Sequence, residues 1–87
     1  MPYLHDAEYL QPNDCVQVRL DQQARVFLLS DSDFSAFRCG RNFRGIGGQA
    51  VRSPVTLRPP HSGHWNTVVE PLPGTSVRAS ISYLKSR

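Results

Sequence analysis

The sequence predicts an all-β protein: a small antiparallel β-sandwich or partly open barrel of about six to seven short strands, with one short helical turn. Three observations predict this fold class. Apolar and polar residues alternate along several short runs, turn-forming residues recur about every 8–12 residues, and the periodicity of amphipathic helices is almost absent. Such a pattern is typical of sandwiches and small barrels.

The N-terminal part predicts two extended segments around a turn. In residues 3–10, Tyr and Leu stand among polar residues, which fits a covering strand or an extended arm. The sequence QPND at residues 11–14 predicts a turn, because Pro fixes φ and Asn and Asp bond back to their own backbone. Residues 16–20 then alternate apolar and polar side chains, which predicts a half-buried strand.

The next strand is harder to orient. Residues 21–24 are interpreted as a hairpin connection, although they lack the Gly or Asn of a tight turn. Residues 25–30, RVFLLS, are almost continuously apolar, so alternation does not say which face is buried. We expect Phe27 and Leu29 to point inward.

A short helix and a loop are predicted next. Residues 31–33, DSD, offer N-cap side chains ahead of Phe34 and Phe37, whose spacing places both rings on one helical face. Gly40 is the expected stop. Residues 39–48 hold four glycines and two arginines and predict a turn or hairpin tip. Such a loop can also bind an anion, but its spacing matches no nucleotide-binding motif.

The third quarter of the chain predicts strand segments at residues 49–52 and 54–58. Val55 and Leu57 are expected inward. Pro54 cannot donate to a sheet ladder, which indicates that this strand is an edge or is bounded by bends.

The last two predicted strands have the clearest phase. In residues 64–70, alternation places Trp65 on the same face as Thr67 and Val69, and we expect Trp65 to enter the core. Residues 76–84 alternate most cleanly, and the residues predicted to face inward are Val77, Ala79, Ile81 and Tyr83.

Size and composition predict one domain, residues 1–87. Hydrophobic residues make up 39% and charged residues 20%, as in an ordinary globular chain. No apolar run is long enough to span a bilayer, and no secretion signal is evident at the N-terminus, so we expect a cytoplasmic protein without a membrane partner. In that reducing compartment Cys15 and Cys39 are expected to be free thiols.

The charge is unevenly distributed along the chain. Residues 1–33 carry a net charge of −4, whereas residues 34–69 carry +5 and no acidic residue. Nine of the ten cations are Arg, whose planar guanidinium suits carboxylate and phosphate groups. One interpretation is a basic binding patch, and the other is that the acidic part of the chain simply lies against the basic part.

Catalytic and metal chemistry have little support in the sequence. His61 and His64 are the only closely spaced pair of ligands, and zinc needs three or four. Ser62 stands beside His61 without the turn motif that exposes a nucleophile. We therefore predict no catalytic residue, no metal and no cofactor.

The hypothesis that these features favour is a non-catalytic interaction or ligand-recognition module, which binds an unknown protein or an anionic ligand through an Arg-rich face. Candidate anion- or partner-binding residues are Arg41, Arg44, Arg52, Arg58, His61 and His64.

The main alternative is a single-stranded nucleic-acid-binding module, because the arginines are interleaved with Phe37, Phe43 and Trp65. A small hydrolytic enzyme is a more distant alternative. An edge strand near Pro54 would also permit a homodimer.

Two motifs in the second half of the chain also suggest a family. Residues 47–54, GGQAVRSP, followed by residues 60–65, PHSGHW, resemble the bacterial domain-of-unknown-function family numbered eighteen-eighty-three. A Gly-Gly, an Arg-Ser-Pro and a Ser-Gly-His-Trp recur in this order in that family. Weaker similarity extends toward both ends, so the resemblance covers nearly the whole chain.

The resemblance implies a small, mainly β bacterial domain that occurs alone or appended to other domains, including TIR-like ones, with no activity assigned. The sequence departs from the family pattern at Asn66 and at residues 45–46, where aromatic residues are expected. If relatives use an aromatic ligand surface there, this protein lacks part of it.

Overall fold

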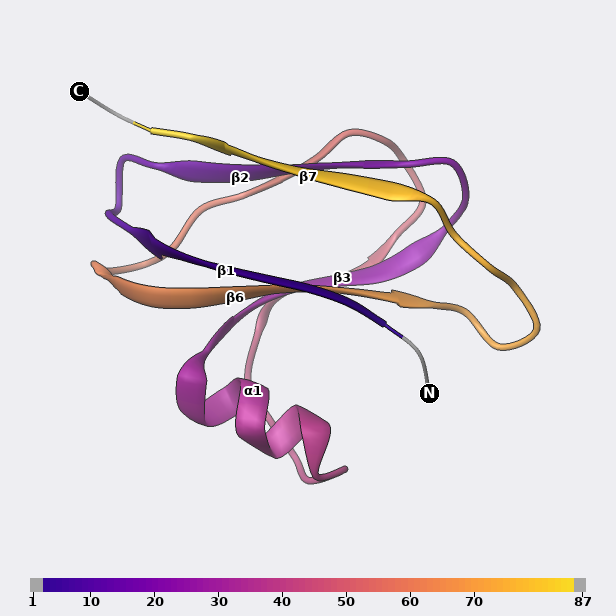
Figure 1. The fold of residues 1–87 in the computed structure, drawn as a ribbon, viewed down its shortest axis with the longest axis horizontal. Coiled ribbons are helices and arrows are strands. Elements are labelled where there is room, and N and C mark those ends of the chain that lie inside the picture. Colours follow the sequence, from indigo (N-terminus) through magenta and orange to yellow (C-terminus); the bar gives the residue numbers. More distant parts are fainter. Residues whose placement is uncertain (1–2, 86–87) are drawn as a thin grey trace.

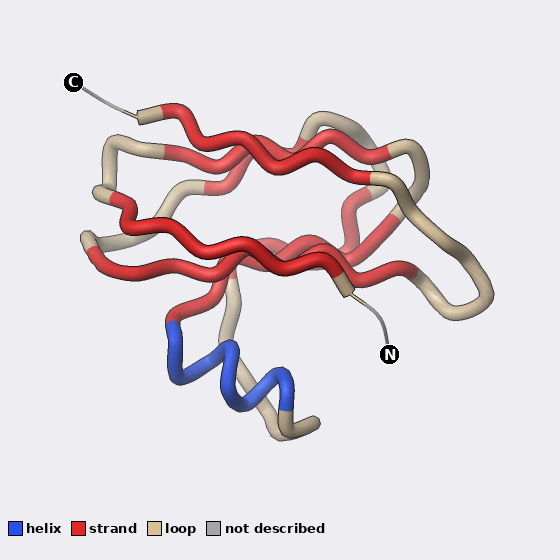
Figure 2. The backbone as a smooth tube through the Cα atoms, in the orientation of Figure 1, coloured by secondary structure: helices blue, strands red, loops and turns tan. Residues whose placement is uncertain are grey.

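The protein consists of seven strands in two antiparallel sheets and one helix, in a computed structural model that describes residues 3–85 (Figures 1 and 2). The predicted domain, residues 1–87, extends two residues beyond this range at each end. Sheet A has the strand order β1 (Leu4–Leu10), β6 (Gly63–Pro71), β3 (Ala24–Ser30) and β4 (Ile46–Ala50). Sheet B has the order β5 (Val55–Leu57), β2 (Cys15–Leu20) and β7 (Ala79–Leu84), and α1 (Asp31–Arg38) lies outside sheet A. The predicted sandwich is confirmed, and its sheets are not closed into a barrel.

The N-terminal segment is a covering strand of sheet A. β1 pairs with β6 along its whole length, from Leu4 opposite Val69 to Leu10 opposite Gly63. The predicted turn follows, because the amide of Asp14 donates to the carbonyl of Gln11 at 2.8 Å. The Asp14 carboxylate accepts the Gln11 amide in return, also at 2.8 Å. This Asx turn carries the chain from sheet A into sheet B.

The hairpin predicted at residues 21–24 is wrong. β2 and β3 belong to different sheets, and β2 pairs with β5 and β7 instead. The connection is held to the entrance of β7, since the Asp21 amide donates to the Arg78 carbonyl and the Asp21 carboxylate accepts the Arg78 amide at 2.7 Å. Without the Gly or Asn of a tight turn, the chain crosses between the sheets rather than folding back.

The predicted orientation of β3 is also wrong. Val26 and Leu28 point into the space between the sheets, whereas Phe27 and Leu29 face α1. The reason is that β3 is covered on both faces, as Leu28 and Leu29 are both fully buried. A strand with two buried faces reads as a continuous apolar run, from which the phase cannot be taken.

The helix forms where it was predicted, with a different cap. Ser30, rather than a residue of the segment 31–33, is the N-cap and accepts the Asp33 amide. Gly40, with φ of 70°, ends the helix as expected. The rings of Phe34 and Phe37 lie on one face of the helix. Together with Phe43 they pack against the outer face of sheet A, on Phe27, Leu29 and Val68.

The predicted loop at residues 39–48 is too long, because β4 already begins at Ile46. Gly47 has φ of 110° while paired with Phe27, and a Cβ built there would lie 2.3 Å from the Val26 carbonyl oxygen. Glycine therefore serves this strand by allowing close approach of two backbones. The segment predicted at residues 49–52 contributes only its first two residues to β4.

The remaining predictions of orientation are confirmed. Trp65, Thr67 and Val69 are buried, with Trp65 and Val69 in the cluster between the sheets. β5 is an edge strand of three residues that follows a cis Ser53–Pro54 bond. The last strand, β7, starts later than predicted, at Ala79. The residues predicted to face inward do pack on the cluster between the sheets: Val77, Ala79, Ile81 and Tyr83.

Neither cysteine is paired in a disulfide: Cys15 is buried in β2 and Cys39 is exposed at the end of α1. Within residues 3–85, no helix has the length and apolar character needed to cross a membrane.

The two-sided burial of β3 predicts equal sensitivity on both faces. Leu28→Ala and Leu29→Ala should each lower the free energy of unfolding by about 2–5 kcal/mol, because each leaves a cavity in a fully packed layer. Leu84→Ala, at a half-exposed position, should change it by less than about 0.5 kcal/mol. Urea denaturation measures all three, and a neutral effect at either Leu28 or Leu29 would contradict two-sided burial.

Candidate functional site

The six residues predicted as a binding site lie in separate regions. Arg41 and Arg44 lie in the connection from α1 to β4, and His64 faces α1 from β6. The other three occur around β5: Arg52 before it, Arg58 after it, and His61 in the connection to β6. The predicted set thus divides between the helix side of sheet A and the edge of sheet B.

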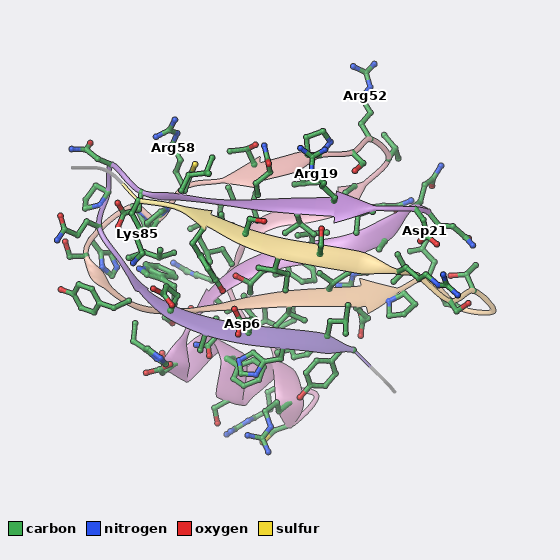
Figure 3. The ribbon with its side chains drawn as sticks, turned by 45° about the horizontal axis from the view of Figure 1, so that its top comes forward. Asp6, Arg19, Asp21, Arg52, Arg58 and Lys85 are labelled. Carbon is green, nitrogen blue, oxygen red and sulfur yellow. The ribbon has the colours of Figure 1, made fainter. Side chains whose placement is uncertain are left out.

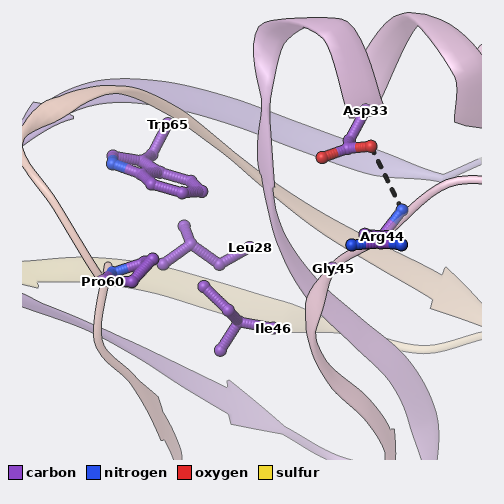
Figure 4. Close-up of a pocket in the computed structure, with 7 residues that line it drawn as sticks. All are labelled: Leu28, Asp33, Arg44, Gly45, Ile46, Pro60 and Trp65. Atoms are coloured by element: carbon purple, nitrogen blue, oxygen red, sulfur yellow. Dashed lines mark hydrogen bonds between the residues drawn. The ribbon is translucent and has the colours of Figure 1, made fainter.

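Arg44 and His61 nevertheless approach one feature, a pocket beside Trp65. The pocket has a volume of about 200 Å³ and is open to solvent. Its apolar lining comes from three strands of sheet A and the connection from β5 to β6, and Asp33 and Arg44 stand on the helix side (Figure 4): the apolar residues are Leu28, Ile46, Pro60 and Trp65. The Arg44 amide donates to the Asp33 carboxylate at 3.1 Å. The ring of His61 is centred 5.0 Å from that of Trp65.

This pocket is small for a metabolite. Typical ligand pockets enclose about 300–1,000 Å³, so a hollow of 200 Å³ suits a single side chain better than a cofactor. The one indole N–H at the site is already used, since Trp65 Nε1 donates to the His61 carbonyl at 3.0 Å. The pocket therefore offers apolar contact and two rim charges, without a free polar group in its floor.

A hydrogen-bonded network that the sequence did not reveal joins β1, β6 and α1. Asn66, which is 3% exposed, accepts from or donates to three neighbours. Its amide oxygen is 2.9 Å from His5 Nε2, and its amide nitrogen donates to the Leu29 carbonyl at 3.2 Å and to the Asp31 carboxylate at 2.8 Å. His64 Nδ1 lies 2.8 Å from the same Asp31 oxygen.

The network fixes the first turn of the helix on the sheet. The hydrogen bond from Asn66 and, second, that from His64 hold the pKa of Asp31 below its usual value of 3.8. The ring of His5 is stacked on Phe34 with centroids 4.1 Å apart, so His5 belongs both to the polar network and to the aromatic packing around α1. The signal in the sequence was Asn66 itself, a polar residue at a covered position of an apolar strand.

A second region stands out by charge: the outer face of sheet B. The strands of this sheet read CVQVRL, VTL and ASISYL and contain no acidic residue. Val16 and Val18 point inward, so Gln17 and Arg19 point outward, opposite Ser82 and Ser80 of β7. In the described part of the chain, no helix covers this face (Figure 1). We call Arg19, Arg58 and Arg78 the outer arginines.

The outer arginines are exposed and unpaired. Within residues 3–85 none of the three guanidinium groups forms an ion pair, whereas Arg25 on sheet A is bonded to Glu70 at 2.9 Å. Arg19 and Arg78 line one shallow hollow with Ser80, and Asp21 stands at its end, where it accepts the Arg78 amide. Figure 3 shows Arg52 and Arg58 projecting from the same side of the molecule, with Arg19 on β2.

Sequence reasoning missed Arg19 and Arg78 because it grouped charges by position along the chain. The fold groups them by layer instead. The acidic residues lie in β1, β6, α1 and the turns: Asp6, Glu8, Asp14, Asp21, Asp31, Asp33 and Glu70. The outer arginines could have been predicted from the sequence as arginines that lie in, or next to, strands without acidic residues and that point outward in the alternation of those strands. The acidic and basic parts of the chain do meet where the Asp33 carboxylate accepts the Arg44 amide, but none of the arginines at residues 34–69 forms an ion pair in the described range.

The fold and these surfaces define a small β-sandwich domain with one sheet covered by a helix and the other open to solvent. The chain belongs to a family described as a domain of unknown function, DUF1883, whose family model matches residues 1–86. The resemblance noted in the sequence is thereby confirmed. No curated protein and no solved structure matches the chain.

The network at the helix N-terminus gives a pH-dependent prediction. Because the folded pKa of Asp31 is depressed, its ionised form stabilises the protein above about pH 3.8, and this contribution is lost as the pH falls through the folded pKa. Asp31→Asn should therefore be less stable than the parent protein near pH 5, and the difference should narrow toward about pH 3. Urea midpoints across this range test it; a difference that stays constant or grows on acidification would show that the carboxylate charge is not responsible.

Proposed function

We propose that this domain is a non-catalytic recognition module that binds an anionic partner on the outer face of sheet B. The observation that carries the proposal is a three-stranded sheet without acidic residues in its strands, which within residues 3–85 is uncovered and bears three arginines that form no ion pair. An exposed guanidinium without an internal partner can pair with a carboxylate or phosphate without first breaking an ion pair. Gln17, Ser80 and Ser82 add hydrogen-bonding side chains between the charges.

The hydrogen bonds around the histidines support a role without catalysis. His61 Nδ1 lies 3.1 Å from the Ser62 carbonyl oxygen, and His64 is bonded to Asp31. In the described part of the chain, no hydroxyl or thiol hydrogen bonds to either ring, as a nucleophile would. No group of three His, Cys, Asp or Glu side chains there is arranged to hold a metal ion.

Packing of the aromatic rings favours an anionic partner in general over a stacked single strand. Phe37 of α1 and Phe43 pack edge to face with centroids 5.4 Å apart against sheet A, and Trp65 is 5% exposed. These rings lie away from the outer arginines, in the clusters on the two faces of sheet A. Base stacking, which gives single-stranded binders much of their affinity, would need rings on the cationic face.

The proposal predicts salt-sensitive binding that depends on the outer arginines. A fluorescently labelled polyglutamate peptide should bind at low salt, and Arg19→Gln with Arg78→Gln should weaken binding about tenfold or more, because two charge-assisted contacts are removed. Arg41→Gln with Arg44→Gln is the charge-matched control and should leave the affinity within about twofold. Fluorescence anisotropy at two salt concentrations measures each.

A labelled single-stranded oligonucleotide distinguishes the alternative. If the oligonucleotide binds and polyglutamate does not, and if the logarithm of the binding constant falls with the logarithm of the salt concentration by about 0.7 per phosphate contacted, the domain is a nucleic-acid-binding module instead. Equal losses in the two arginine pairs would mean that net charge, rather than this face, attracts the anion. No binding of either anion at low salt would end the proposal.

A further inference from the structure

The sheets of this protein end in four edge strands, and three of them are protected. An edge strand presents unpaired backbone N–H and C=O groups, which invite another strand unless charge, proline, shortness or a covering segment prevents it. β1 and β4 are the edges of sheet A, and β5 and β7 are those of sheet B.

The edges at β1 and β7 protect each other. Lys85, directly after β7, forms an ion pair with Glu8 at 3.1 Å and donates to the Tyr9 carbonyl of β1. Asp6 adds a second carboxylate on the inward side of β1, beside Tyr83. Burial, with a smaller contribution from Asp6, raises the pKa of Tyr83 to about 12, as expected for a phenol enclosed beside acidic groups. Inward charges and a covering lysine are devices that discourage strand addition.

The edge at β5 is protected by its length and its sequence. It has three residues, Val55–Leu57, and Pro54 precedes it. A proline at the start of so short a strand leaves little ladder for another chain to extend.

β4 lacks the charge, the proline and the shortness that protect the other edges; it contacts β5, and its Gly47 and Gly48 have φ of 110° and 155°. Its sequence, IGGQA, has no charge and no proline, and it pairs with β3 from Leu28–Ile46 to Ala24–Ala50 without an inserted residue. Gly48 is opposite the inward-facing Val26, and a Cβ built at Gly48 would meet no other atom within 4 Å. The rim of the sandwich is therefore open at this position for lack of a side chain.

An open groove runs along this edge. It has a volume of about 580 Å³ and is lined by residues 47–52 with Pro54 and Val55. Val51 is 62% exposed and adds an apolar side chain to the groove. Arg52 supplies the single charge among the lining residues, so the groove is apolar with one cationic end group.

We propose that the β4 edge receives an extended segment of a partner protein as an added strand of sheet A. Backbone hydrogen bonds to β4 would provide much of the affinity, as in other β-strand additions. The groove fits a segment that alternates apolar residues, directed at Val51 and Val55, with polar ones and that carries a carboxylate near Arg52. This surface is distinct from the outer arginines, so either proposal can fail without the other.

A second copy of this chain is the competing occupant. The charge of the groove favours a different chain, because a β4 edge brings no carboxylate to Arg52: Ile46–Ala50 and the following two residues contain no acid. Two copies paired through β4 would leave both guanidinium groups without a partner at the interface.

Selection from a displayed library of random octapeptides on the intact protein tests the proposal. Recovered peptides should alternate apolar and polar residues and be enriched in Asp or Glu. In a ¹⁵N NMR titration the synthetic form of a selected peptide should shift the amides of Ile46–Ala50, and alternate backbone N-methylation of the peptide should abolish binding, because it removes the strand hydrogen bonds.

Charge exchange supplies the matched control. Arg52→Glu should weaken binding of the acidic peptide about tenfold or more, and it should allow binding of a peptide that has Lys in place of the acidic residue. Arg58→Glu, outside the groove, should leave the affinity for the acidic peptide within about twofold. The double variant of Arg19 and Arg78 should also retain peptide binding. The proposal is wrong if no peptide is selected, if selected peptides shift amides outside β4, or if they still bind after N-methylation. It is also wrong if light scattering shows a dimer that is formed through β4 and that Arg52→Glu leaves intact.

Discussion

Burial of sheet A on both faces is the constraint on which the rest of the molecule depends. Leu28 and Leu29 are adjacent in β3, and Val68 and Val69 are adjacent in β6, yet all four are fully buried. Successive side chains of a strand point to opposite faces, so these pairs require a packed layer on each side of the sheet. Sheet B supplies one layer, and α1 with Phe43 supplies the other. The helix is thus a structural cover whose absence would expose a row of large apolar side chains.

The same constraint explains the polar network and limits where a partner can bind. Asn66 lies on the covered face, where an unpaired amide would cost about 1–3 kcal/mol, and its three hydrogen bonds remove that cost while fixing the start of the helix. With sheet A covered on both faces, the parts of the two sheets left open to a macromolecular partner are the outer face of sheet B and the strand edges. The outer face of sheet B is polar and cationic, and the edge at β4 is neutral and open.

Strands with one solvent-facing side were predictable from the sequence, and those without one were not. Residues 79–84 alternate because their outer face meets water, so their phase was predicted correctly. β3 has no such face, and its phase was predicted wrongly for that reason. The partner of β2 could not be read either, because the hydrogen bonds that hold Asp21 to Arg78 join residues 57 positions apart. The candidate site failed in a related way: arginines close in sequence, such as Arg44 and Arg52, lie in different regions, whereas Arg19 and Arg78 line one hollow.

The four edge strands of the sandwich differ in how they are protected against strand addition. A protein that only had to avoid association would protect each of its edges, and this chain protects β1 and β7 through the contacts of Lys85 and β5 through its shortness and Pro54. Gly47 is required by its close approach to Val26, and Gly48, with φ of 155°, has a backbone conformation that favours glycine. Packing does not require the exposed Val51 that follows this strand. An edge left without charge or proline in a molecule that otherwise protects its edges is best explained by a strand that comes from outside.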